Sequence, residues 1–292
     1  MRSQPPQASG ARVLAGTARQ RRLRSSYGPW ALVTGASDGI GRAMAMQLAE
    51  AGLNLVLVAR RRELLEALAK DLMQKHPIEA RALALDLGQH TAIDALISAS
   101  GDLEIGLLAA VAGFGTSGRF IDSVLDDELD MVDVNCRAVV GLSHHFARRF
   151  AARRRGGIVL MSSLLAFQGV PRAATYAATK SFIQTFAEGL RPELAACGVD
   201  VIASAPGPVR SGFEARANMR LGSAVTPEVV ARQTLEALGR RATIRPGFLS
   251  KFLEASLLAL PRRTRSRIMG IVMGSMTRHQ HGGEEPQERR LA

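Results

Sequence analysis

The sequence predicts an α/β fold in which one doubly wound parallel sheet carries helices on both faces. Short apolar runs alternate with helical patterns along most of the chain, as parallel strands with crossover helices require. A glycine-rich turn joins the first apolar run to a helix. Hydrophobic residues make up 47% of the 292 residues, which is enough for a substantial core in a single domain.

Each expected element follows from its local pattern. The apolar runs predict strands over 30–33, 54–58, 80–85, 106–111, 157–161 and 199–203. Helical patterns cover 43–50, 61–74, 91–98, 174–196 and 227–238, and the stretch 125–154 predicts two further helices. Four strands lead into candidate functional segments, at Gly35, Asp86, Ser163 and Pro206. Because ligands bind at the carboxyl edge of an open parallel sheet, we expect one site there.

The turn after the first strand has the sequence T-G-A-S-D-G-I-G, residues 34–41. Gly35 permits a tight turn, Gly39 lets the backbone approach a pyrophosphate, and Gly41 lets the next helix pack close to the sheet. The N-terminus of that helix offers free N–H groups and a partial positive charge to phosphates. The residues assigned to this cofactor loop are Gly35, Ser37, Asp38, Gly39, Ile40 and Gly41. An ordinary glycine-rich turn is the alternative.

A second motif carries acid–base chemistry. Tyr176 and Lys180 lie four residues apart in Y-A-A-T-K, and Ser163 lies thirteen residues before Tyr176. A tyrosine can exchange a proton with an alcohol or carbonyl oxygen, and a lysine one helical turn away can lower the phenol's pKa. A serine hydroxyl can hold the reacting oxygen. We expect these three residues to be catalytic, with Ser162 as the neighbouring alternative to Ser163.

These motifs, with P-G-P-V-R-S at 206–211, occur in an order that resembles the short-chain dehydrogenase/reductase family, from about residue 28 to about residue 247. The resemblance implies a single Rossmann-type domain that transfers a hydride between NAD(P) and an alcohol or carbonyl. The glycine loop followed by L-V-L-V-A-R-R also resembles a branch with 17-beta-hydroxysteroid dehydrogenase-like and 3-ketoacyl reductase-like members.

The resemblance also implies roles for single residues. Asp86 would bond the adenine amino group, with the N–H of Leu87 beside it, although Asp86 as a helix cap is the alternative. Ala112 and Gly113 would approach the cofactor ribose. Asn135 would place a water near the active lysine through its carbonyl and so assist catalysis, or it could be a helix-interior polar residue that faces a loop.

The segment 110–113 departs from the family pattern, while the segments 206–211 and 212–224 complete the expected site. The family has N-N-A-G where this chain has A-V-A-G at 110–113, and the missing asparagines help hold the central sheet. The turn at 206–211 would lie beside the nicotinamide, through Pro206, Gly207, Val209 and Ser211. The segment 212–224 would cover the substrate with Phe213, Met219 and Leu221, or form an ordinary surface loop.

The end of the second strand favours NADP(H) over NAD(H). NAD-preferring enzymes usually place an acidic residue there, and this chain has Ala59 instead. Arg60, with Arg61 as a further candidate, could pair with a 2′-phosphate. Arg62 is better explained as a solvated charge at the start of a helix. Asp38 is a complication, because some NADP-preferring relatives have a basic residue at that position.

Positive charge concentrates at the two ends of the chain. Residues 1–28 contain six arginines and no acid, and residues 261–292 contain seven arginines and three glutamates, within a net charge of +12. The near-neutral centre argues against binding to nucleic acid. We expect a disordered basic extension over 1–28, the cofactor-binding domain over 29–247, and a C-terminal helical extension with a basic tail over 248–292.

The sequence of the C-terminal region predicts an apolar contact surface beside this domain. The stretch 248–260 predicts a helix, while two glycines within 268–276 argue against a strong one there. Packing over the substrate entrance or against another subunit is favoured, and weak association with a membrane surface is the alternative. The chain has neither a secretory signal nor a long apolar span, so we expect a cytoplasmic location.

The favoured function is an NADP(H)-dependent oxidoreductase acting on an apolar ketone or secondary alcohol. A non-catalytic NADP-binding sensor or scaffold is the alternative, which the altered A-V-A-G keeps open. Isomerase or dehydratase chemistry on nucleotide sugars is disfavoured by the glycine spacing and the P-G-P-V turn. Cys136 and Cys197 have no metal-like spacing, so no metal is expected. The family resemblance implies a homodimer or homotetramer.

Overall fold

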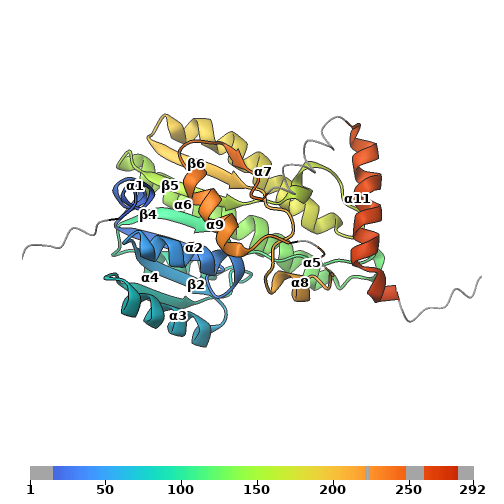
Figure 1. Cartoon of the computed structure of the whole chain (residues 1–292), viewed down its shortest axis with the longest axis horizontal. Helices are drawn as coiled ribbons and strands as arrows, with labels where there is room; N and C mark the ends of the chain where they lie inside the picture. The colour runs from blue at the N-terminus through green and yellow to red at the C-terminus, as the bar shows by residue number, and fades with distance from the viewer. Residues whose placement is uncertain (1–15, 221, 223, 248–259, 282–292) are drawn as a thin grey trace, which may run out of the picture.

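The computed structural model describes residues 16–220, 222, 224–247 and 260–281 (Figure 1). Within these residues, parallel strands form one sheet in the order β3-β2-β1-β4-β5-β6-β7. The strands are β1 Trp30–Thr34, β2 Asn54–Ala59, β3 Ala80–Ala84, β4 Ile105–Ala110, β5 Gly156–Met161, β6 Val199–Ser204 and β7 Thr243–Ile244. The strand order reverses direction between β1 and β4, which is where a doubly wound sheet opens a crevice for ligands.

Helices cover both faces of the sheet (Figure 1). One face packs against α2 Gly39–Glu50, α3 Arg62–Lys75 and α9 Pro227–Ala237. The other face packs against α4 Ala92–Ala99, α6 Ala138–Ala152 and α7 Ala174–Ala195. The predicted fold class is therefore confirmed, and the strands and helices predicted between residues 30 and 238 lie within a few residues of their expected bounds.

The predicted pair of helices in 125–154 is also present, and its junction is unusual. Helix α5 Leu125–Val132 continues into a π-helical turn, η2 Asp133–Arg137, and then into α6. A π-helical turn inside a longer helix commonly marks a functional site. Here it contains Asn135, which is 1% exposed and faces the carboxyl end of β4.

The N-terminal segment differs from the expected disordered extension. Residues Ala18–Tyr27 form α1, which Thr17 caps by accepting a hydrogen bond from the Gln20 N–H. Leu23 and Tyr27, one turn apart, are both buried, and the Tyr27 hydroxyl donates to Asp200 at 2.7 Å. The arginine-rich composition suggested a solvated segment, but these two residues give the helix one apolar face. Residues 1–15 lie outside the described part of the chain.

The C-terminal segment also differs from the structure that its sequence predicts. Residues Arg262–Met276 form helix α11 despite Gly270 and Gly274, and Met269 and Met273 on this helix are buried. A side chain at position 270 would press on Pro171, so glycine allows close packing there. The predicted helix over 248–260 falls almost wholly outside the described residues. Among those described, we find no helix with the length and apolar character needed to cross a bilayer.

Thr34 ties the two central strands together beside the altered A-V-A-G segment. Its hydroxyl oxygen accepts hydrogen bonds from the backbone N–H groups of Val111 and Ala112, both at 3.0 Å. The side chain is 1% exposed, so water does not compete for these donors. The end of β1 therefore holds the end of β4 in place, although the asparagines typical of the family are missing there.

We predict that Thr34→Val lowers the free energy of unfolding by about 1 kcal/mol, because it removes the hydroxyl that accepts from the part-buried N–H of Ala112. Urea denaturation of the wild type and the variant measures this difference. Thr34→Ser keeps the hydroxyl and is the matched control. Equal stability of Thr34→Val and wild type, or equal losses in the two variants, would contradict the assigned role.

Candidate active site

A cavity of about 540 Å³ lies at the carboxyl edge of the sheet. One end is lined by the glycine loop and by Arg60, Arg61 and Asp86, and the middle by the segments that carry Tyr176 and Lys180. The other end is formed by side chains from the segment 212–219 and from α11. All sequence-predicted site residues line this one cavity except Asn135, which lies behind its wall.

The glycine loop has the geometry of a phosphate cradle. Gly35 and Gly39 have positive φ angles of 69° and 51°, a region that glycine occupies without strain. An added Cβ at Gly35 would come within 2.9 Å of the Ala112 backbone, and one at Gly41 would collide with the Gly35 carbonyl. The loop therefore lets α2 start close to the sheet with its N-terminus facing the cavity. This fits the pyrophosphate of a dinucleotide.

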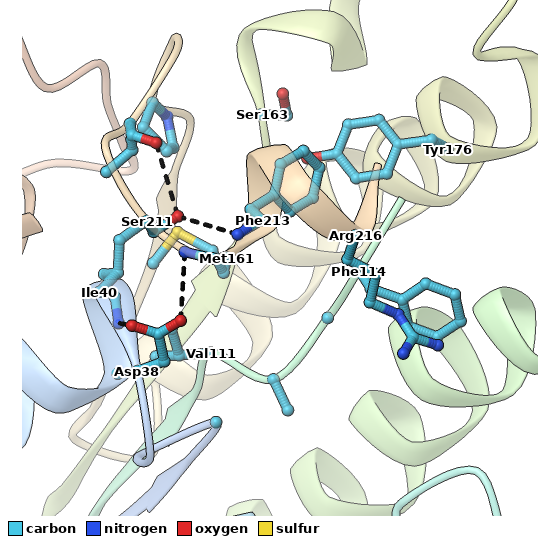
Figure 2. A pocket seen from close by; sticks show the side chains of 18 of the residues that line it. Asp38, Ile40, Val111, Phe114, Met161, Ser163, Tyr176, Ser211, Phe213 and Arg216 are labelled. Carbon is cyan, nitrogen blue, oxygen red and sulfur yellow. Dashed lines mark hydrogen bonds between the residues drawn. The ribbon is translucent and has the colours of Figure 1, made fainter. Parts of the chain in front are cut away.

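Asp38 connects this loop to the segment expected to cover the substrate (Figure 2). Its carboxylate accepts hydrogen bonds from the Gly39 N–H at 2.7 Å and the Gly212 N–H at 3.1 Å. A side chain at position 212 would meet the Asp38 carboxylate, so glycine is required at this contact. Asp38 thus caps α2 and also fixes the start of the covering segment.

Basic residues gather at the adenosine end of the cavity. Arg61 donates a hydrogen bond to the Ser37 hydroxyl at 3.0 Å, which holds its guanidinium beside the glycine loop. Arg60 lines the same part of the cavity, at the end of the strand that finishes with Ala59. Arg62 instead pairs with Glu66 at 3.7 Å and does not line the cavity.

Asp86 and Leu87 follow β3 at the same end of the cavity. The Asp86 carboxylate accepts from the Gly88 N–H at 3.1 Å and so closes a short turn. Helix α4 begins later, after Thr91, so Asp86 is not its cap. Leu87 is buried in the core and presents part of its surface to the cavity.

The predicted catalytic residues meet in the middle of the cavity. Tyr176 and Lys180 lie one turn apart on α7 and are both buried. Ser163 follows the end of β5 and lies near Tyr176 (Figure 2). The Lys180 ammonium donates to the Met161 carbonyl at 2.9 Å and lies 5.6 Å from the centre of the Tyr176 ring. Ser162 donates to the Lys180 backbone carbonyl at 3.2 Å, which leaves Ser163 as the serine beside the tyrosine.

Burial dominates the protonation of this pair. It raises the pKa of Tyr176 to about 12, against a smaller lowering by Ser163. It also lowers the pKa of Lys180 to about 8, and Cys136 weakly opposes that shift. The net shift of the Tyr176 pKa is therefore opposite to the lowering expected from Lys180. The ammonium is directed to a backbone carbonyl, and the cost of desolvating a phenolate is the larger effect.

The side chain of Asn135 is held by three hydrogen bonds. Its amide donates to the Phe114 carbonyl at 2.9 Å and to the Thr179 hydroxyl at 3.0 Å, and accepts from the Phe114 N–H at 3.1 Å. These contacts fit the alternative role of a buried polar residue that faces a loop, and the placing of a water by the Asn135 backbone carbonyl stays a prediction. An added Cβ on Gly113 would lie 2.8 Å from the Asn135 oxygen and 3.2 Å from the Lys180 nitrogen. Asn135 therefore fixes the wall beside Lys180.

The turn after β6 is held on both sides. The Pro206 carbonyl accepts from the Leu164 N–H at 2.9 Å, and Val209 forms a parallel bridge with Val225. Ser211 accepts from the Phe213 N–H at 3.4 Å (Figure 2). Gly207 lines the cavity between them. The predicted nicotinamide-side residues therefore form one fixed edge of the site.

The covering segment is partly helical and contacts the catalytic tyrosine. Helix α8 Phe213–Arg216 places the Phe213 ring 5.3 Å from that of Tyr176. Met219 is buried and lines the cavity. Leu221, also predicted for this cover, is outside the described residues.

Sequence analysis missed several lining residues, namely Phe114, Arg216, Met269, Val272, Met273 and Met276. For α11 a signal was present, because apolar residues recur at helical spacing in 268–276. Gly270 and Gly274 argue against a helix on sequence grounds, so the pattern alone did not predict α11. Phe114 and Arg216 carry no local pattern that marks a pocket, because their role arises only when separate segments meet.

Comparisons with known proteins agree with this geometry. A family model described as short chain dehydrogenase matches residues 29–221. A 7beta-hydroxysteroid dehydrogenase of Clostridium sardiniense is 34% identical over 233 residues, which cover 78% of this chain and 89% of the relative.

Two solved structures are similar over most of the chain. One, from work on 7beta-hydroxysteroid dehydrogenase stereoselectivity, has a TM-score of 0.79 at 28% identity and covers 85% of this chain and 98% of its own. The other is a short-chain dehydrogenase from Sphingobium yanoikuyae in complex with NADPH, with a TM-score of 0.71 at 27% identity, covering 90% and 98%. With the matched model spanning most of the chain, this protein belongs to the short-chain dehydrogenase family of oxidoreductases.

Proposed function

We propose that the protein binds NADPH across the sheet edge and reduces an apolar ketone, or oxidises the corresponding secondary alcohol. The convergence of Ser163, Tyr176 and Lys180 on the cavity that the glycine loop enters is the observation that carries this proposal. The NADPH complex of the Sphingobium yanoikuyae relative supports the choice of cofactor. The steroid substrates named for the similar dehydrogenases support a large apolar one.

The residues have complementary roles in this reaction. Bound NADPH supplies a hydride to the carbonyl carbon. Tyr176, which its raised pKa keeps protonated near neutral pH, donates its phenolic proton to the oxygen that becomes the alcohol. Ser163 donates a hydrogen bond to the same oxygen and orients it. Lys180 lies next to the phenol and steadies the charge that remains after the proton has left.

The basic residues at the adenosine end support a preference for NADP(H). Arg60 and Arg61 both line the cavity beside Ala59, and Ser37 holds Arg61 there by a hydrogen bond. No carboxylate ends β2 to accept from a ribose hydroxyl or repel a phosphate. A guanidinium forms charge-assisted bonds with a phosphate, which makes these arginines the proposed 2′-phosphate contacts.

Tyr176→Phe should lower turnover by about 10²–10⁴-fold while the variant still binds NADPH, because only the transferable proton is lost. Steady-state reduction of apolar ketones and quenching or enhancement of NADPH fluorescence measure the two quantities. Tyr27→Phe is the matched control, since Tyr27 is the only other tyrosine and lies in α1, bonded to Asp200. Full activity of Tyr176→Phe would exclude the proposed proton donor.

Combining Ala59→Asp with Arg60→Ala should shift the ratio of NADPH to NADH affinity by about 10–100-fold towards NADH. This range corresponds to the free energy of one lost hydrogen bond to a charged group. Fluorescence titration with each cofactor measures the ratio. Arg62→Ala removes the same charge outside the cavity and should leave the ratio unchanged. An unchanged ratio in the double variant would reject the assignment.

The lowered pKa of Lys180 makes the stability of the fold depend on pH. Its pKa is about 8 when folded and 10.5 in the ordinary case, so between these values the unfolded chain binds more protons. The cost of burying the cation is therefore full below about pH 8 and is relieved as the pH rises towards about 10. Relative to Lys180→Met, the wild type should gain roughly a few kcal/mol of unfolding free energy across this window. Parallel pH curves from urea denaturation would contradict the shift.

A further inference from the structure

One charged side chain, that of the exposed Arg216, lies at the substrate end of the cavity, where the lining is otherwise apolar. Its walls are aromatic and aliphatic side chains, from Phe114, Leu165, Phe213, Met219, Met269 and Met273. Arg216, at the end of α8, lines the same space. Among the described lining residues, the other charged side chains are Lys180 beside the tyrosine, Arg60, Arg61 and Asp86 at the adenosine end, and Asp38, whose carboxylate is bonded to the N–H groups of Gly39 and Gly212.

Arg216 has a fixed position relative to the reacting atoms. Phe213 and Arg216 lie three residues apart on α8, a spacing that puts them on one face of a helix. Phe213 contacts the Tyr176 ring, and the Arg216 guanidinium lies 4.1 Å from the centre of the Phe114 ring (Figure 2). Asn135 is hydrogen-bonded to the N–H and the carbonyl of Phe114, so the backbone that carries the ring under the guanidinium is fixed in position.

The guanidinium retains its capacity to bind an anion. Arg216 contacts Phe114 through a cation–π interaction, and none of the ion pairs found between described residues includes Arg216. Glu214 lies two positions earlier, which on a helix is a different face. A guanidinium stacked on a ring through its flat side keeps its edge N–H groups free for a bidentate contact.

We propose that Arg216 binds a carboxylate at the far end of the substrate, which is then an apolar ketone or alcohol with an acidic tail. This inference rests on the proposed function and adds the substrate class. A carboxylate is preferred to a phosphate because a single guanidinium matches one negative charge in fork geometry. The apolar walls hold the body of the molecule, Tyr176 holds the reacting oxygen, and Arg216 sets the distance between the carbonyl and the acid.

The test uses ω-benzoyl fatty acids of graded chain length and their methyl esters, which differ only in the terminal charge. Calorimetry in the presence of cofactor gives the affinities, and NADPH consumption gives kcat/KM. At the chain length that spans the two groups, we expect the wild type to favour the acid over the ester by roughly tenfold or more. In Arg216→Met this ratio should fall to about one, since a methionine packs on Phe114 without charge.

Arg220→Met is the matched control. Arg220 lies in the same segment and carries the same charge, but its side chain is not among those that line the cavity. This variant should keep the wild-type ratio, which separates a local contact from the general attraction of a basic protein. Arg216→Lys keeps the charge without the fork and should give an intermediate ratio.

The outcomes separate this inference from the proposed function. Equal binding of acid and ester by the wild type at every chain length, or an unchanged ratio in Arg216→Met, would overturn the carboxylate site even if ketones are reduced. Tighter binding of the acid that requires Arg216, without any reduction of acid or ester, would support the carboxylate site and count against the proposed reaction.

Discussion

The site depends on the buried amide of Asn135. Three hydrogen bonds from this one side chain hold both backbone groups of Phe114 and the Thr179 hydroxyl. They join the loop after β4 to the helix that carries Tyr176 and Lys180. Because the amide is almost fully buried, water cannot replace any of these bonds at low cost. The helix with the catalytic residues and the loop of Phe114 at the substrate end are therefore held in place by the same side chain.

The π-helical turn explains how this anchor is reached. A regular helix from α5 into α6 presents its side chains at a fixed angular step, and the wider turn at 133–137 changes that step locally. Asn135 then points at the loop of β4 and at α7 together. Gly113 must be glycine for the same reason, because any side chain there would occupy the space between the Asn135 oxygen and the Lys180 nitrogen.

Local patterns were sufficient to predict strands β1 to β6 and the helices between them, and the edge of the sheet at which the candidate site residues lie. Gly35, Ser163 and Tyr176 each belong to a motif of a few residues, so their placement follows once the strands are placed. Arg216 was not predictable in this way, because the Phe114 ring that it contacts lies about a hundred residues earlier in the chain. The protonation of Tyr176 also escaped prediction, since the burial of a phenol depends on segments that close over it only in the fold.

Methionines form much of the roof over the substrate end, with Met219 from the covering segment and Met269, Met273 and Met276 from α11. Their unbranched thioether chains can adopt several shapes at little cost, whereas the opposite edge is built from hydrogen-bonded backbone. Substitutions at these methionines can therefore change which substrate shapes fit the cavity, while the geometry of proton transfer stays unchanged. Because the methionine-lined end is adaptable and the hydrogen-bonded edge is rigid, substrate selectivity can evolve in this fold independently of the catalytic residues.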